Sequence, residues 1–317
     1  MRVEVCDTDG TTGVGYATQT PAITGDTLDG MERFVYGLAS RRLLGRVIGP
    51  TLFGDLAHLA AVSPSATAAI DMALHQLHAP DHHASVATVT TSVTVSAGDT
   101  DAMVHAARRR IAEGFGHIKV KLGVDPDGDL VRLRRIVEAV DGQAHVWVDA
   151  NQGWTLGQTL AIIETALARG VGPSMLEQPV RANAFDDLDR IARAIPIPVT
   201  ADESARSLAD IDRLADGGAV CAVNIKLMKF GGLTGAAAAA ERARSHGMTV
   251  LIGSMMEHPH SVAAAVRFAY ELERNRPTGL GGGTFTDDTG NVVHDLDAAW
   301  WTTVSDPCRY DAGRVSA

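Results

Sequence analysis

Two lysines stand two residues apart in the stretch 116–123, which reads Gly-His-Ile-Lys-Val-Lys-Leu-Gly. Side chains alternate between the faces of a strand, so Lys119 and Lys121 point one way while Ile118 and Val120 point the other. Burying two ammonium groups on one strand face is costly unless acids or a functional cavity meet them. An exposed strand with a lysine-bearing face is the simpler alternative, and the residues that follow decide between the two.

Acidic residues end the next three apolar runs of the chain, at Asp149, Glu177 and Asp202. Three converging carboxylates repel one another unless they bind a cation, and an all-oxygen site of this kind suits Mg²⁺. Lys226 ends the following run, across from the two earlier lysines. Any one of these acids could merely cap the next helix. The whole set, with the lysines, favours a metal-assisted site surrounded by ammonium groups.

The elements that must position these residues begin near residue 85, where short apolar runs alternate with alanine-rich amphipathic segments. The predicted strands are 89–95, 118–122, 146–149, 175–177, 199–201, 223–226, 249–253 and 292–296. The predicted helices between them are 101–113, 129–140, 156–169, 186–194, 208–215 and 236–245. Such a repeat of nearly all-apolar strands predicts an α/β fold, a (β/α)₈ or TIM-like barrel, whose chemistry sits where strands end. An open doubly wound sheet would need a glycine fingerprint after its first strand, and the sequence lacks one there.

The first part of the chain has a different texture. A hairpin is predicted over residues 3–17, with its turn at 7–10, and helices are predicted over 28–44 and 66–77. We therefore expect a small α+β capping domain at 1–84, the barrel at 85–300, and a C-terminal segment, 301–317, that packs back on the cap.

Composition limits the classes of function. The chain has 317 residues, of which 45% are hydrophobic and 21% charged, as in a globular protein with a sizeable core. The net charge of −10 argues against nucleic acid as a partner. Charged residues near the N-terminus and the lack of a long apolar run predict no membrane association and a cytoplasmic location.

Five stretches, IKVKLG, VDANQGW, LEQPV, TADES and NIKLMKFGG, resemble in order and spacing the muconate-lactonizing-enzyme branch of the enolase superfamily, the mandelate racemase/muconate lactonizing enzyme family. The resemblance covers about residues 85–300. It implies three Mg²⁺ ligands, two acid/base residues on opposite faces of a substrate, and two substrate contacts. The Mg²⁺ ligands would be Asp149, Glu177 and Asp202. The acid/base residues would be Lys121 and Lys226, and the substrate contacts would be Lys119 and Glu257. Lys119 would help to neutralise the substrate carboxylate and lower the pKa of Lys121.

The chemistry implied is removal of a weakly acidic proton next to a carboxylate, which leaves an enediolate. A divalent ion stabilises that charge, and a crowded lysine can serve as the neutral base. Lysines on both faces allow removal on one side and return on the other, which is epimerisation. One lysine as base and the other as acid would give elimination.

A further stretch bears on the substrate. Asp295 and Asp297 resemble the D-x-D motif of dipeptide epimerases in this branch, which binds the free α-ammonium of the substrate at the end of the eighth strand. Their spacing puts both on one face, a suitable anion pair for an amine. Surface acids near a strand end are the plainer reading of so short a motif. The small-molecule carboxylate expected as substrate is therefore a dipeptide, of the L-Ala-D/L-Glu kind.

Several stretches depart from the family pattern. The opening strand and mobile substrate loop of the family would precede this chain, so we expect weaker specificity, capping from another subunit, a mis-set start or lost activity. Ala17 stands where the family has glutamate, His258 to His260 is unusual, and residues 279–284 look like an insertion.

Alternatives stay open at this point. A lyase or cycloisomerase of the same superfamily, such as an acid-sugar dehydratase, o-succinylbenzoate synthase or muconate cycloisomerase, would use the same ion and lysines. A Schiff-base aldolase on Lys226, or a catalytically impaired homologue that only binds, would also fit. Homo-oligomer formation is an expectation from the resemblance.

Overall fold

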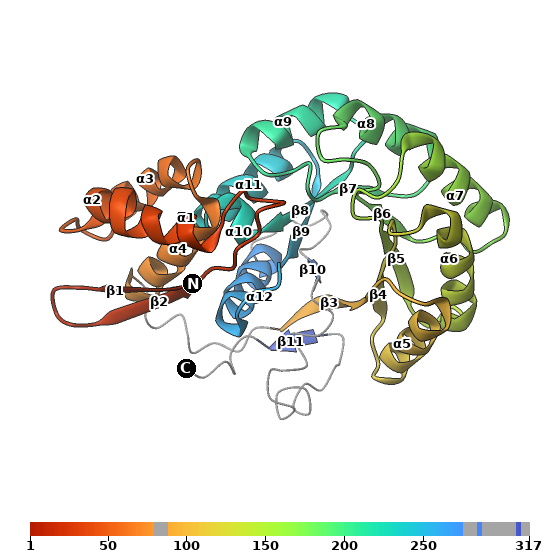
Figure 1. Ribbon diagram of the computed structural model, residues 1–317, viewed down its shortest axis with the longest axis horizontal. Coiled ribbons are helices and arrows are strands. Elements are labelled where there is room, and N and C mark those ends of the chain that lie inside the picture. Colours follow the sequence, from red (N-terminus) through yellow and green to blue (C-terminus); the bar gives the residue numbers. More distant parts are fainter. Residues whose placement is uncertain (79–87, 275–283, 287–308, 312–317) are drawn as a thin grey trace.

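Eight parallel strands close into a ring in the computed structural model, which describes residues 1–78, 88–274, 284–286 and 309–311 (Figure 1). The strands follow one another round the ring in chain order, and β10 pairs with both β9 and β3. They are β3 (Thr88–Val95), β4 (His117–Lys121), β5 (His145–Asp149), β6 (Met175–Glu177), β7 (Val199–Ala201), β8 (Ala222–Lys226), β9 (Thr249–Gly253) and β10 (Thr284–Thr286). The predicted TIM-like barrel is confirmed.

The end of the chain is described only in part. The eighth strand predicted at 292–296 lies outside the described residues. The ring is completed by β10, which comes before that segment in the sequence. β11 (Arg309–Asp311) pairs antiparallel with the beginning of β3. Nothing else of the segment 301–317, nor of the glycine run 281–283, is among the described residues.

Helices cover the outside of the ring (Figure 1). They are α5 (Thr100–Ala112), α6 (Pro126–Val140), α7 (Leu156–Ala168), α8 (Phe185–Ala194), α9 (Leu208–Gly217), α10 (Leu227–Phe230), α11 (Leu233–Ser245) and α12 (Pro259–Arg274). Local signals fix their starts: Asp99 caps α5, and Thr155 and Gln158 form a reciprocal capping box at α7. None of the described helices is long and apolar enough to cross a membrane.

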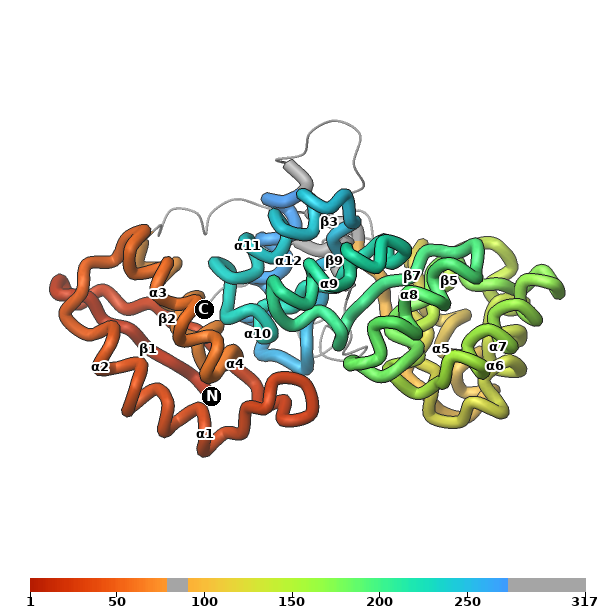
Figure 2. Tube along the Cα trace, turned by 90° about the horizontal axis from the view of Figure 1, so that it is seen from above, coloured from red at the N-terminus to blue at the C-terminus, as the bar shows by residue number. Residues whose placement is uncertain are grey.

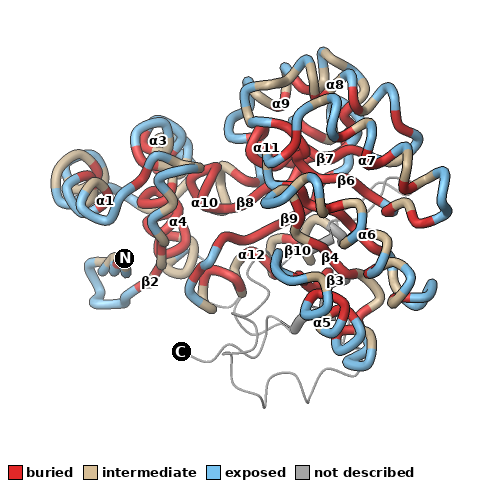
Figure 3. The backbone as a smooth tube through the Cα atoms, turned by 45° about the vertical axis from the view of Figure 1, so that its right-hand side comes forward, coloured by how far each residue is buried: buried red, intermediate tan, exposed pale blue. Residues whose placement is uncertain are grey.

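Strands β4 to β9 are buried on both faces along most of their length, whereas the helices alternate between buried and exposed residues (Figure 3). One strand face packs against the helices. On the other, Trp147, Met175 and Leu251 form a separate apolar cluster. Trp147 and Met175 stand two residues before Asp149 and Glu177, so they lie on the same strand face as these acids. This cluster lies in the ring below the acids, where the Thr200 hydroxyl also donates to the sulfur of Met175.

The N-terminal part contains β1 (Arg2–Cys6), β2 (Thr12–Tyr16), α1 (Leu28–Phe34), a π-helical segment (Val35–Ala39), α2 (Ser40–Leu43), α3 (Pro50–Ala60) and α4 (Pro64–His78). The predicted hairpin is confirmed, and it packs closely on α4. A Cβ at Gly13 or Gly15 would collide with the carbonyl oxygen of Ala73 or Ala69, so only glycine permits this approach. Figure 2 shows this part beside α10 to α12, at the opposite end of the molecule from α5 to α7.

A buried carboxylate on α4 joins the N-terminal part to the barrel. Asp71 is fully buried and accepts hydrogen bonds from the backbone N–H of Leu233, at 2.5 Å, and of Thr234, at 3.3 Å. The Thr234 hydroxyl donates to its other oxygen. Burial raises the pKa of Asp71 to about 7, although these hydrogen bonds oppose the shift. Asp71 thus satisfies the N-terminus of α11, the helix that follows the Lys226 stretch.

Candidate active site

Four of the predicted site residues lie together at the ends of β4, β5 and β6. Lys121 is in register with Asp149, and Asp149 with Glu177. Lys119 Nζ lies 3.0 and 2.9 Å from the two carboxylate oxygens of Glu177 and 3.4 Å from Oδ2 of Asp149. Lys121 Nζ lies 3.1 Å from the same Oδ2. The side chain of Lys119 is fully buried, whereas that of Lys121 is 19% exposed, so Lys121 is the more exposed lysine of this pair.

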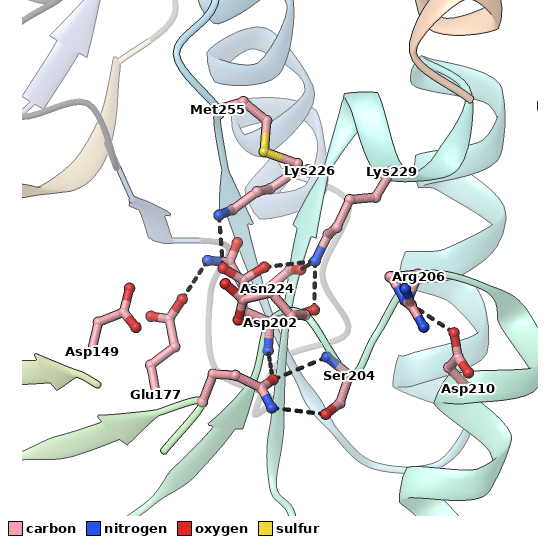
Figure 4. A network of polar contacts seen from close by, with 12 residues as sticks. Asp149, Glu177, Asp202, Ser204, Arg206, Asp210, Asn224, Lys226, Lys229 and Met255 are labelled. Carbon is pink, nitrogen blue, oxygen red and sulfur yellow. Dashed lines mark hydrogen bonds and ion pairs between the residues drawn. The ribbon is translucent and has the colours of Figure 1, made fainter. Parts of the chain in front are cut away.

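The third acid and the third lysine come from the next two strands of the ring, and Figure 4 shows both, Asp202 and Lys226. Asp202 follows β7 directly, and Lys226 ends β8 with its Nζ 2.7 Å from Oδ2 of Asp202. β4 and β8 are four strands apart in either direction round the ring. Lys121 and Lys226 therefore reach the acidic centre from opposite sides, as the sequence predicts.

A lysine that the sequence analysis did not single out lies under Asp202. Lys229 Nζ donates to Oδ1 of Asp202 at 2.7 Å, to its backbone oxygen at 2.8 Å and to the backbone oxygen of Asn224 at 2.7 Å. Burial lowers the pKa of Lys229, and Asp202 opposes that shift. The amide of Asn224 in turn donates to Glu177 at 2.9 Å. The chain has four lysines, and all of them belong to this centre.

Gln178 fixes the loop that carries Asp202. Its Oε1 accepts the backbone N–H of Asp202 at 2.9 Å and of Ser204 at 3.0 Å, while its Nε2 donates to the Ser204 hydroxyl at 2.8 Å. Its backbone has a left-handed φ of 35°, a costly conformation that persists where surrounding contacts determine it. The Gln that follows Glu177 in LEQPV thus positions the acid of the next strand.

Glu203 is a further buried acid beside the predicted ligands. Its Oε1 accepts a hydrogen bond from the Asn151 amide at 2.7 Å. Burial, and then the neighbouring Asp202 and Asp149, raise the pKa of Glu203 to about 8. Glu203 is therefore held as a neutral acid at neutral pH in this arrangement of charges.

Glu257 is buried just beyond β9, and its Oε1 accepts the backbone N–H of Met255 at 2.7 Å. The unusual residues after it contact the N-terminal hairpin. The His258 ring stacks on Tyr16 with a centroid distance of 3.7 Å, and the Ser261 hydroxyl donates to the Tyr16 carbonyl at 3.0 Å. Ala17, the position at which the family has glutamate, is buried. The stretch 258–261 thus lies between the site and the hairpin.

The loops that follow β4 and β5 lock together. A Cβ at Gly123 would collide with the carbonyl oxygen of Ala150, and one at Gly153 with that of Gly123. Asp129 holds both loops, because one of its oxygens accepts the backbone N–H of Gly123 at 2.7 Å and the indole N–H of Trp154 at 2.8 Å. The glycines of IKVKLG and VDANQGW are therefore required by backbone contact.

The donor set fits a hard divalent cation. Asp149, Glu177 and Asp202 are nearly or fully buried and present only carboxylate oxygens. Among the described residues, Oδ2 of Asp149 accepts no hydrogen bond and meets two lysines as ion pairs alone. In this arrangement the ammonium groups neutralise the acids, and the described residues contain no group of three or more His, Cys, Asp or Glu set to hold an ion. The three ligands stay a prediction.

Sequence reasoning and structure cover different parts of the site. Asp295 and Asp297 lie outside the described residues. Lys229, Gln178, Asn224 and Glu203 were missed, although each stands inside one of the five motifs.

Comparison with known proteins gives the same picture as this geometry. The enolase C-terminal domain-like family matches residues 102–297. The L-amino acid-D/L-Glu epimerase of Francisella philomiragia subsp. philomiragia is 33% identical over 281 residues, which cover 85% of this chain and 78% of that protein.

Two solved structures show the same fold. The substrate-liganded L-Ala-D/L-Glu epimerase from Bacillus subtilis aligns with a TM-score of 0.82 and 28% identity, over 90% of this chain and 80% of that one. The dipeptide epimerase from Methylococcus capsulatus, complexed with Mg and the dipeptide L-Arg-D-Lys, aligns with a TM-score of 0.78 and 32% identity, over 92% and 82%. The chain therefore belongs to the enolase C-terminal domain-like family, in its mandelate racemase/muconate lactonizing enzyme branch, and is similar to the dipeptide epimerases of that branch.

Proposed function

We propose that this protein is a Mg²⁺-dependent isomerase that removes and returns the proton next to a carboxylate, and that its substrate is a dipeptide. The observation that carries the proposal is the pair of lysines on opposite strands of the ring, each ion-paired with a different carboxylate of one acidic centre. A substrate bound between them has one lysine on each face. Such a pair serves inversion of a stereocentre.

Each lysine has a distinct task in this proposal. Lys121 takes the proton from one hand of the substrate and Lys226 takes it from the other, and each returns it in the reverse direction. Lys119, held by Glu177 and Asp149, faces the carboxylate end of the substrate. Glu257 adds a further polar contact beyond β9.

Asp149, Glu177 and Asp202 would hold the Mg²⁺. When bound, the ion stabilises negative charge on the carboxylate oxygens of the enediolate. It would also take over the acids that now neutralise Lys121 and Lys226. An ammonium that loses its carboxylate partner has a lower pKa, which suits a lysine that must act as a neutral base.

The dipeptide assignment rests on Asp295 and Asp297 and on the similar proteins. Two acids spaced by one residue can bind the substrate ammonium. The similar proteins are named for epimerisation of dipeptides, and one was solved with Mg and L-Arg-D-Lys. The side chains that this protein accepts are the open part of the proposal.

Deuterium exchange tests the reaction. The protein is incubated in D₂O with Mg²⁺ and a pooled library of L,L-dipeptides that includes Ala-Glu, and products are analysed by mass and by chiral separation. Epimerisation adds one deuterium and yields the other hand, whereas a dehydratase product would lose water. EDTA should abolish both signals.

Lys121→Arg and Lys226→Arg are the matched variants, because arginine keeps the charge and the ion pair but cannot act as a base. Each variant should slow epimerisation at least about 100-fold, and each should retain exchange with one hand of the substrate only. Exchange with both hands in either variant would refute the division of labour between the lysines. Exchange that persists in EDTA would refute the metal dependence.

We further propose the division into a cap at 1–84, a catalytic barrel at 85–300 and a C-terminal segment at 301–317. Action in the cytoplasm as a homo-oligomer completes the proposal, on the strength of the sequence and of the family resemblance. Light scattering after size-exclusion chromatography tests self-association, and a monomeric mass would contradict it.

A further inference from the structure

Lys229 uses every donor it has. An ammonium group carries three N–H donors, and the three acceptors of Lys229 are Oδ1 and the backbone oxygen of Asp202 and the backbone oxygen of Asn224. All three distances lie between 2.7 and 2.8 Å. Its side chain is fully buried. Lys229 therefore has no donor to offer a substrate, and its role is to position its neighbours.

The two carboxylate oxygens of Asp202 are divided between two lysines, as Figure 4 shows. Oδ1 faces Lys229 and Oδ2 faces Lys226, each at 2.7 Å. The Lys229 side is closed, because this ammonium also bonds the backbone of Asp202 and of β8. The Lys226 side ends at the centre of the ring. A ligand that takes the place of Lys226 there would meet Oδ2.

The sequence makes this division rigid. Lys226 ends β8 and Lys229 lies in α10, which follows it directly, so one continuous stretch of chain presents both lysines to Asp202. Gln178 independently holds the backbone N–H of Asp202. Asp202 is thus fixed at its N–H, its carbonyl and one carboxylate oxygen.

We propose that Lys229 is a positioning residue that restricts Asp202 to a single ligating oxygen and thereby makes the site select Mg²⁺ over Ca²⁺. Mg²⁺ requires a small octahedral set of ligands, whereas Ca²⁺ takes more ligands and accepts both oxygens of one carboxylate. Closing Oδ1 removes the bidentate option that Ca²⁺ uses. The inference rests on the proposed function in that Asp202 is taken as a metal ligand.

Calorimetric titration of the metal-free protein with Mg²⁺ and with Ca²⁺ tests this without any substrate. Lys229→Met removes the three N–H donors and keeps an unbranched side chain of similar size. It should weaken Mg²⁺ binding by about 10- to 100-fold, the usual effect of losing a residue that orients a ligand. The affinity for Ca²⁺ should change by less than about threefold. The carboxylate of Asp202 is then less well fixed, but its Oδ1 becomes a second ligand for Ca²⁺, and the two effects offset each other. Lys229→Arg, which keeps a donor toward Oδ1, should restore part of the preference for Mg²⁺.

A second measurement uses the wild-type protein and does not depend on how the variants fold. Because the chain has four lysines, labelling with ¹³C,¹⁵N-lysine gives four side-chain ammonium signals. The Lys229 ammonium, assigned through its bonded carbons, should exchange slowly with water and should stay slow when Mg²⁺ saturates the site. The signals of Lys121 and Lys226 should move.

The outcomes separate this inference from the proposed function. A folded Lys229→Met protein with unchanged Mg²⁺ affinity, an unchanged ratio of Mg²⁺ to Ca²⁺ affinity, or loss of the slow Lys229 signal on Mg²⁺ binding would overturn the role of Lys229. Metal-dependent epimerisation would still stand in each of these cases. A wild-type protein that binds no Mg²⁺ would instead refute the proposed function itself.

Discussion

The buried carboxylate that joins α4 to α11 should make the stability of this protein fall as pH rises. Burial raises the pKa of Asp71 to about 7, whereas the unfolded chain releases the same proton near 3.8. Between these two values the folded protein holds a proton that the unfolded chain has lost. The contribution is therefore complete below about pH 4 and is lost as pH rises through about 7.

The magnitude follows from the shift. One pKa unit corresponds to about 1.4 kcal/mol, so the free energy of unfolding should fall by about 1.4 kcal/mol per pH unit between pH 4 and 7. From pH 5 to pH 8 the loss through Asp71 is about 2.5 kcal/mol. Asp71→Asn keeps an acceptor for the N-terminus of α11 and an amide that can donate to Thr234, but it carries no proton to lose.

Urea unfolding of the wild type and of Asp71→Asn from pH 5 to pH 8 measures this effect as the difference between their free energies of unfolding. The wild type should lose about 2.5 kcal/mol relative to Asp71→Asn across that range. His75 Nε2 lies 3.6 Å from Oδ1 of Asp71, but burial lowers the pKa of His75 to about 4, which is below the range of the experiment. Asp99→Asn at the exposed cap of α5 gives the baseline for changing a capping carboxylate to an amide. A difference in the free energy of unfolding that does not change with pH, or a wild type that gains stability as pH rises, would refute the reasoning. Either result would show that hydrogen bonds from the α11 N–H groups affect the pKa of Asp71 more than burial does.

Three further changes test local packing. Trp154→Phe removes the indole donor to Asp129 and should cost about 1–3 kcal/mol in urea unfolding; an unchanged midpoint would mean that water replaces it. Thr155→Ala breaks the capping box of α7 and should cost about 1 kcal/mol, whereas an equal stability would show that the cap contributes nothing. Gly15→Ala forces a methyl group against the carbonyl of Ala69 and should cost at least about 1–3 kcal/mol; a stable variant would contradict the close packing of hairpin and helix.

The barrel was predictable because its signal is local and repeated. Strands β5, β6 and β8 are short, mostly apolar runs, and they end in Asp149, Glu177 and Lys226, respectively, where the structure places the site. Lys119, Lys121, Asp149, Glu177 and Lys226 could be placed in this way, since alternation along a strand fixes which side chains share the interior. No knowledge of tertiary contacts is needed for that step.

Other features depend on contacts that the sequence does not display. The helix predicted over 28–44 becomes α1, a π-helical segment and α2, and the Ser40 hydroxyl bonds the Val35 carbonyl five residues back at 2.5 Å. α3 and α12 were missed, although each begins at a proline, Pro50 and Pro259, which favours the first position of a helix. The roles of Asp71 and Lys229 arise from partners far along the chain or beneath another strand, and no periodicity points to them.

The mutual contact of Gly123 and Gly153 bears on how the site can move. Each glycine lies against the backbone of the other loop, so neither loop can be displaced without carrying its neighbour along. Gly123 lies two residues after Lys121, and Gly153 lies four residues after Asp149. Opening at this edge of the ring is therefore a joint motion, in which the lysine and the acid travel together and keep their spacing.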